Sequence, residues 1–150
     1  MIQSSKHFAE KFKSTKQMSV QDIVKKDIAV NGKRLGVTLG QGYGAIKNFK
    51  DNGATFKRVG NTLFIIVSTN NGTVIYHSVN ADPLRTFLYN CLVFFSFLHD
   101  QGYTQAITYF SDSYTQKLLQ KYKLQNETIA PSNDPNQGSM MLVTNLTRSD

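Results

Sequence analysis

The stretch that decides the fold is residues 62–98, TLFIIVSTNNGTVIYHSVNADPLRTFLYNCLVFFSFL. Its first half holds two runs of apolar and β-branched residues, 62–68 and 73–79, separated by Asn70-Asn71-Gly72. Asn-Gly is favoured in two-residue hairpin turns, because both central residues of such a turn need positive φ values. The first half therefore predicts a β-hairpin over residues 62–79.

The second half of the stretch predicts a long helix. Asp82-Pro83 is typical of a helix start, with the aspartate as N-cap and the proline at the first helical position. Apolar residues then recur at helical spacing on one stripe and form a second face beside it, so we expect a helix that is buried on two sides and ends at Gly102. The stripe holds Leu84, Phe87, Leu88, Cys91, Leu92, Phe95 and Leu98, and the second face holds Val93, Phe94 and Phe97.

Outward from this stretch, the C-terminal side predicts further strands at residues 104–110, 126–130 and 140–146. A short helix capped by Asp112 or Ser113 is expected after the first of these strands, and a polar loop before the last. The closing part of the chain therefore adds both helix and sheet.

The N-terminal side is less regular. Ser19 can cap a helical turn, and Asn31-Gly32 predicts a second hairpin over residues 27–39, because runs of strand type flank it. Residues 45–60 are ambiguous, apart from a turn at 51–53. The glycine-rich residues 40–44 lack the Gly-Lys-Ser/Thr ending of a phosphate loop. We interpret them as the flexible segment that leaves the hairpin, or as a contact site formed mainly by backbone atoms.

The chain has 150 residues, the size of one domain. We expect a basic helical arm over residues 1–26 and a single α/β domain over residues 27–150. No stretch is apolar for long enough to span a bilayer, and the first residues lack the pattern of a secretory signal, so we expect a cytoplasmic protein without a membrane partner. The single cysteine, Cys91, excludes an internal disulfide and is expected to be a buried small hydrophobe. The three histidines have no metal-ligand spacing, so no metal site is predicted.

The net charge of +7 is unevenly placed along the chain. Residues 1–60 carry twelve Lys and Arg against four acids, a net +8, whereas residues 61–150 carry five against six, a net −1. A basic half favours a polyanionic partner such as nucleic acid, an acidic protein surface or anionic lipid, although a solvated lysine face fits equally well. A helix that is apolar on several faces also permits a homo-oligomer. The candidate interaction residues are Lys25, Lys26, Lys33, Arg34, Lys57 and Arg58.

The element order over residues 61–146 resembles the GNAT family of N-acetyltransferases. This resemblance implies an α+β fold, a GNAT-like mixed sheet with antiparallel hairpins and two main helices. In the family, acetyl-CoA binds where a Gln/Arg-x-x-Gly-x-Gly/Ala loop enters the long helix. The matching residues 79–84 contain no glycine, and Asp82 brings a carboxylate to the helix entrance, so we expect no cofactor. If acetyl-CoA does bind, the resemblance implies contacts from Asn80, Ala81, Arg85 and Asp112.

A family motif in the short helix also departs from the pattern. The family often has a tyrosine general acid seven residues after an asparagine, and these positions fall on Leu119 and Asp112. Leucine cannot donate a proton, so no catalytic residue is assigned. We expect a non-catalytic GNAT-like structural or interaction protein, similar to the GNAT-like virion and assembly components of tailed bacteriophages. Two alternatives stay open: an active acyl-CoA-dependent N-acetyltransferase, and a polyanion-binding module for nucleic acid.

Overall fold

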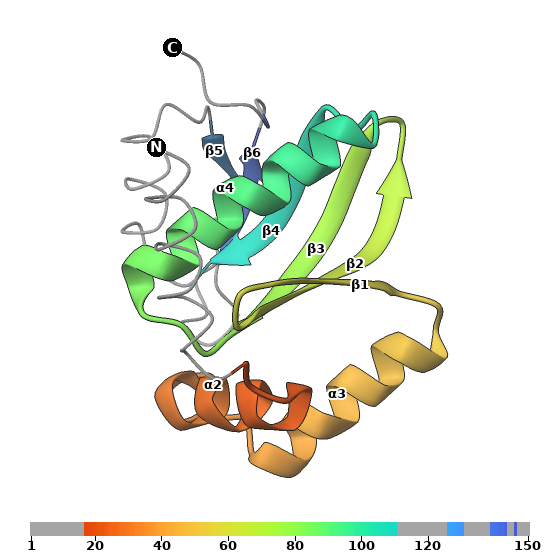
Figure 1. The fold of residues 1–150 in the computed structure, drawn as a ribbon. Coiled ribbons are helices and arrows are strands. Elements are labelled where there is room, and N and C mark those ends of the chain that lie inside the picture. Colours follow the sequence, from red (N-terminus) through yellow and green to blue (C-terminus); the bar gives the residue numbers. More distant parts are fainter. Residues whose placement is uncertain (1–16, 111–125, 131–138, 144–145, 147–150) are drawn as a thin grey trace, which may run out of the picture.

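A computed structural model describes residues 17–110, 126–130, 139–143 and 146, in three layers (Figure 1). A mixed sheet forms the middle layer, α4 packs on one of its faces, and α2 and α3 lie together on the other. The elements are, in chain order, α2 (Val20–Leu35), α3 (Leu39–Asp51), β1 (Thr55–Val59), β2 (Thr62–Asn70), β3 (Thr73–Asn80), α4 (Leu84–Asp100), β4 (Gln105–Phe110), β5 (Asn126–Ala130) and β6 (Ser139–Val143).

The sheet has the strand order β1-β2-β3-β4-β6-β5. Only β3 and β4 are parallel, and α4 connects them, as the crossover of a parallel pair requires. All other neighbouring strands are antiparallel. The α+β class, the mixed sheet and the antiparallel hairpins expected from the sequence are therefore confirmed.

The hairpin predicted over residues 62–79 is β2 and β3. Its turn residues Asn71 and Gly72 have φ values of 49° and 80°, both positive as the Asn-Gly pair indicated. The strands pair from Asn70 opposite Thr73 to Thr62 opposite Asn80, with one irregularity between Ile66 and Ser68. The turn thus sets the register that directs alternate side chains to the two faces of the sheet.

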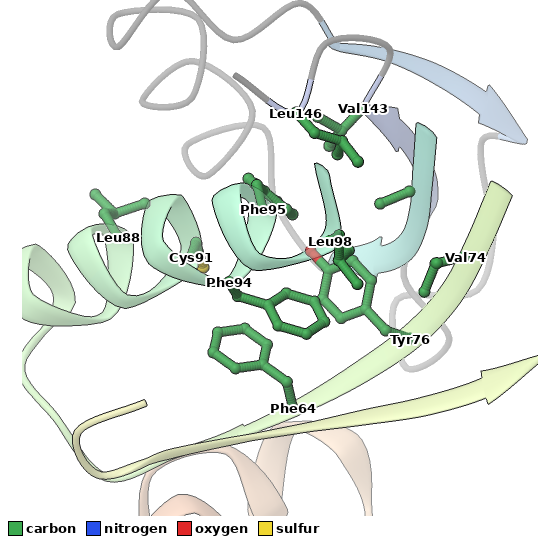
Figure 2. Close-up of a cluster of buried hydrophobic side chains, with 11 residues drawn as sticks. Phe64, Val74, Tyr76, Leu88, Cys91, Phe94, Phe95, Leu98, Val143 and Leu146 are labelled. Carbon is green, nitrogen blue, oxygen red and sulfur yellow. The ribbon is translucent and has the colours of Figure 1, made fainter. Parts of the chain in front are cut away.

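The main core lies between α4 and the sheet, and Figure 2 shows its side chains. The rings of Phe64 on β2 and Phe94 on α4 stack with centroids 4.1 Å apart, and Tyr76 meets Phe94 edge-on at 5.0 Å. Such aromatic pairs contribute packing energy beyond their buried area. The two-sided burial predicted for α4 is confirmed, except that Leu84 and Val93 remain 43% and 37% exposed.

A second, smaller apolar layer covers the opposite face of the sheet. Ile65 is buried, and it alternates along β2 with Phe64 of the main core, so it points away from α4. Ile23 and Val24 of α2 are buried as well, and the ring of Phe49 on α3 stacks on His77 of β3 at 5.3 Å. These contacts hold α2 and α3 to the sheet.

The hairpin predicted over residues 27–39 is wrong, because this segment is the end of α2 and the turn into α3. Gly32 lies within the helix, where an added Cβ would come within 2.7 Å of the Val37 carbonyl. The positive φ belongs to Gly36, at 67°, and the Val37 amide donates to the Gly32 carbonyl at 2.8 Å, which closes the helix end. Burial of the apolar face of α2 thus outweighs the local Asn-Gly signal.

The glycine-rich residues 40–44 are also helical and form the first half of α3. Thr38 caps this helix: its hydroxyl accepts from the Gln41 amide at 3.2 Å, while the Gln41 side chain accepts from the Thr38 amide at 2.8 Å. Neither a hairpin exit nor a phosphate loop is therefore present there. Two main helices were expected, whereas the described residues contain three, because residues 20–51 are mostly helical.

The expected helix ends, domain boundary and loops can be compared with the structure in the same way. Ser19 caps the start of α2, accepting from the Asp22 amide at 3.1 Å, and Gly102 ends α4. The boundary predicted between residues 26 and 27 falls inside α2. The short helix after Asp112 and the polar loop before β6 lie outside the described residues. No helix within the described ranges is both long and apolar enough to cross a membrane.

Candidate functional site

The loop between β3 and α4 is where the GNAT resemblance implies a cofactor, and its amide protons are all donated within the protein. The amide of Asn80 donates to Oδ1 of Asp27 on α2 at 3.2 Å. The amide of Ala81 donates to the carbonyl of Asn61 at 3.0 Å, and that of Asp82 to Oδ1 of Asn80 at 3.0 Å. The remaining loop residue is a proline without an N–H. The loop therefore has no free backbone donor for an anion.

Asp82 does not cap α4, so that prediction is wrong. Its Oδ2 accepts hydrogen bonds from the Asn61 amide and from Nδ2 of Asn90, each at 2.9 Å. The carboxylate is thus directed into the turn between β1 and β2. The N-cap of α4 is Pro83, and no side chain caps the helix.

Two buried polar side chains extend these contacts into the protein. Nδ2 of Asn90 also donates to Oγ1 of Thr62 at 3.0 Å, and that hydroxyl donates to Oδ1 of Asn80 at 2.8 Å. Nδ2 of Asn80 donates a hydrogen bond to the Asp82 carbonyl at 2.8 Å. Buried polar groups are costly unless they are paired, and each of these finds a partner. We call Asn61, Thr62, Asn80, Asp82 and Asn90 the loop network.

The loop network is held from outside by Arg58 on β1. Its Nε donates to the Gly60 carbonyl at 2.9 Å, and its Nη2 donates to Oδ1 of Asn61 at 2.8 Å. The Met18 amide, just before α2, donates to the same Asn61 oxygen at 3.1 Å. An added Cβ at Gly60 would come within 2.9 Å of the Asp82 carboxylate, which shows how closely the turn and the loop approach each other.

The predicted interaction residues come from two elements, α2 and β1. Lys25 and Lys26 are exposed on α2. On β1, Lys57 places its Nζ 4.5 Å from the centroid of the Phe97 ring, and Arg58 belongs to the contacts just described. Lys33 and Arg34 end α2, and their side chains lie outside the described part of the structure.

Arg85, Asp112, Cys91 and the histidines are the other residues that the sequence singles out. Arg85 is exposed in the first turn of α4, and Asp112 lies outside the described residues. Cys91 is buried, as expected for a small hydrophobe, and burial raises the pKa of its thiol to about 12. Burial lowers the pKa of His77, which is stacked on Phe49. Within the described ranges, no group of three His, Cys, Asp or Glu side chains could hold a metal ion.

The parallel strands β3 and β4 separate soon after they begin to pair. Their register runs only from Thr73 opposite Gln105 to Ile75 opposite Ile107. Beyond this point the buried side chain of Tyr76 lies on the α4 side, with its ring centroid 5.0 Å from that of Phe94. Burial raises the pKa of Tyr76 well above its usual value, so this tyrosine is a poor proton donor.

Sequence reasoning missed most of the loop network, although one signal for it was present. Asn90 follows Phe87 by three residues and precedes Phe94 by four, so it lies on the apolar face of the helix. A polar side chain on a buried face needs a hydrogen-bond partner. The contact of Asp27 with Asn80 has no local signal, because 53 residues separate the two.

Comparisons with known proteins give one informative match. Neither a protein-family model nor a curated protein sequence matches the chain. Among solved structures, the chain is similar to an acetyltransferase of the GNAT family from Staphylococcus aureus Mu50, with a TM-score of 0.53 and 9% sequence identity. The match covers 88% of this chain and 98% of that one. It shows a GNAT-like fold and nothing of the activity.

The amides of the β3–α4 loop offer no donor to the diphosphate of acyl-CoA. A diphosphate at a helix entrance is held by free backbone N–H groups, and the amides of Asn80, Ala81 and Asp82 are already donated, which leaves the uncapped first turn of α4 as the source of such donors. The Asp82 carboxylate adds a negative charge to this loop, with its Oδ2 directed into the β1–β2 turn.

Proposed function

We propose that this chain is a non-catalytic protein with a GNAT-like fold that acts by binding another macromolecule. The observation that carries the proposal is the internal use of every donor in the β3–α4 loop. A loop closed in this way has to break its own hydrogen bonds before its amides can hold a cofactor. The buried Tyr76 and Cys91, which resist ionisation, add no acid or base to the site.

The test is a thermal-shift titration of the full chain with acetyl-CoA up to about 1 mM. A ligand at 100 times its Kd stabilises the native state by about 2.7 kcal/mol, so binding with a Kd in the micromolar range would be seen readily. We expect no saturable rise in Tm. A saturable rise, confirmed by calorimetric titration, would show that the loop opens for the cofactor and would overturn the proposal.

We propose further that the protein is a structural or assembly component, similar to the GNAT-like proteins of bacteriophage particles. Its uneven charge supports docking through the N-terminal half, since residues 1–60 carry a net +8. The test is mass spectrometry of particles purified from the source that encodes the chain. Stoichiometric copurification is expected, and absence from the particles would contradict this assignment.

A second candidate is an active acyl-CoA-dependent N-acetyltransferase, and two observations favour it. The first-turn amides of α4 have no side-chain cap and could meet an anion. Beyond Ile75 and Ile107 the backbone groups of β3 and β4 do not pair with each other, so an extended amide chain could lie between them. This candidate predicts release of the CoA thiol from acetyl-CoA with an amine acceptor, and loss of that release in Arg85→Ala. A flat trace over a broad panel of amines disposes of it.

A further inference from the structure

The solvent-facing seam between α2 and α3 joins residues from both helices. Oη of Tyr43 on α3 donates to the carbonyl of Gln21 on α2 at 3.2 Å, so the tyrosine reaches across to the first turn of α2. Lys47 and Lys50 follow Tyr43 at i+4 and i+7, and Lys25 follows Gln21 at i+4. Residues at these spacings share one face of a helix, so the lysines flank the tyrosine.

This face points away from the rest of the protein. The inner side of α3 is defined by Gly42, whose added Cβ would lie 3.2 Å from Val24 and Ile28 of α2, and by Phe49, which stacks on His77. In Figure 1, α2 and α3 lie side by side and apart from α4, at the outside of the molecule. We call Lys25, Tyr43, Lys47 and Lys50 the lysine seam, and all four side chains are exposed.

The charge of the seam is available to a partner. No ion pair joins these lysines to a carboxylate in the described part of the chain. Asp22 and Asp51 are the exposed acids on the two helices, while Asp27 turns to the Asn80 amide. Lys57 and Arg58, in contrast, are engaged within the domain.

The seam also carries apolar surface. Tyr43 is 36% exposed, and Val20, which begins α2 beside Gln21, is 37% exposed. Tyrosine is enriched at the centre of protein interfaces, whereas nucleic-acid surfaces contact many phosphates through lysine and arginine, more than the three lysines of the seam supply. The combination of three lysines with an exposed aromatic ring therefore favours a protein partner over a nucleic acid.

We propose that the lysine seam is a docking surface and that its partner is an acidic protein segment with apolar side chains. The proposal rests on the proposed binding function and names the surface and the chemistry of the partner. The ammonium groups of Lys25, Lys47 and Lys50 pair with carboxylates, while Tyr43 packs against apolar side chains.

The test measures binding of the full chain to a fluorescein-labelled peptide of about 20 residues, with Glu and Leu on opposite faces of a helical pattern, by fluorescence anisotropy. The triple variant Lys25→Glu, Lys47→Glu, Lys50→Glu is expected to weaken binding about tenfold. The matched control compares two double variants with the same change in net charge, Lys47→Glu, Lys50→Glu in the seam and Lys26→Glu, Arg85→Glu outside it, and the second is expected to keep the wild-type affinity. Tyr43→Ala is expected to weaken binding, and Tyr43→Phe, which keeps the ring, to preserve it.

Three results overturn the proposal. The first is no peptide binding by the wild type, and the second is equal loss of affinity in the two double variants. The third is tighter binding to a labelled DNA duplex than to the peptide, with the DNA binding abolished in the triple seam variant. Circular dichroism and Tm establish that each variant is folded. Titration of the same proteins with acetyl-CoA separates the two proposals. If acetyl-CoA binds and the peptide results are as expected, only the proposed non-catalytic function is contradicted. If the peptide does not bind and acetyl-CoA does not bind either, only the docking role of the lysine seam is contradicted.

Discussion

The carboxylate of Asp82 lies 2.9 Å from the backbone nitrogen of Asn61, a residue 21 positions earlier in the chain. The same oxygen accepts a hydrogen bond from the side chain of Asn90, which lies in the second turn of α4. One acid thus joins the β1–β2 turn, the β3–α4 loop and α4. Its place in this contact makes Asp82 a structural residue, where the sequence pattern had indicated a helix cap.

Asp82→Ala should lower the free energy of unfolding by about 1–3 kcal/mol, because the Asn61 amide and the Asn90 side chain each lose an acceptor in a partly buried site. Urea unfolding measures the change. Asp82→Asn keeps an oxygen that can accept one of these bonds, so its loss should be smaller. Equal stability of wild type and Asp82→Ala would mean that the contact contributes nothing.

Asn90→Leu tests the buried end of the loop network. Asn90 is 4% exposed, and its removal leaves the Asp82 carboxylate and the Thr62 hydroxyl with one donor fewer each. We expect a loss of about 1–3 kcal/mol despite the gain in apolar volume. Tyr89→Ala is the matched control on the same helix, since Tyr89 is 65% exposed and should change stability by about 0.5 kcal/mol or less.

The glycines of α3 should respond differently to alanine. An added Cβ meets nothing within 4 Å at Gly40 or Gly44, so each substitution should stabilise the protein by up to about 1 kcal/mol through helix propensity. At Gly42 the Cβ would press on Val24 and Ile28 at 3.2 Å, so the gain should be reduced or reversed. Calorimetric Tm values distinguish these outcomes. A gain at Gly42 as large as at the other two would argue against the close crossing of α2 and α3.

Cys91 should be inert to alkylation in the native protein. Burial raises the pKa of its thiol to about 12, so at pH 8 its thiolate fraction is about three orders of magnitude below that of an exposed cysteine. Iodoacetamide labelling followed by mass spectrometry should show slow modification in buffer and rapid modification in guanidinium. Rapid labelling of the folded chain would contradict the burial of Cys91 against the sheet.

His77 should make stability depend on pH below neutrality. Its folded-state pKa is lowered by burial, so the unfolded chain takes up the proton more readily. The stabilisation from neutral His77 is complete above the unfolded pKa of about 6.5 and is lost as the pH falls through that value toward the folded pKa. His77→Phe keeps a ring against Phe49 without titrating, so its unfolding free energy should fall less between pH 7.5 and 5. Parallel curves for the two proteins would refute this role.

The parts of the fold that were predicted correctly carry strong local signals. Asn71-Gly72 supplies the positive φ values of a hairpin turn, and the apolar stripe of α4 repeats at the helical period over four turns. The segment around Gly32 carried the same kind of turn signal but folded as a helix. There the apolar face of Ile23 and Val24 gains more by packing on the sheet than the turn gains locally.

The candidate site also has features that the sequence predicts and features that it does not. The strand and the long helix on either side of it followed from the sequence, since periodicity and turn chemistry act between near neighbours, while its choice as a cofactor site came from the resemblance to the GNAT family. The direction of the Asp82 carboxylate, the use of the loop amides and the meeting of Tyr43 with α2 were decided only by tertiary structure. Apart from the Asp82 amide, which donates to nearby Asn80, these contacts depend on residues distant in sequence, and no local pattern records which distant partner will satisfy a buried polar group.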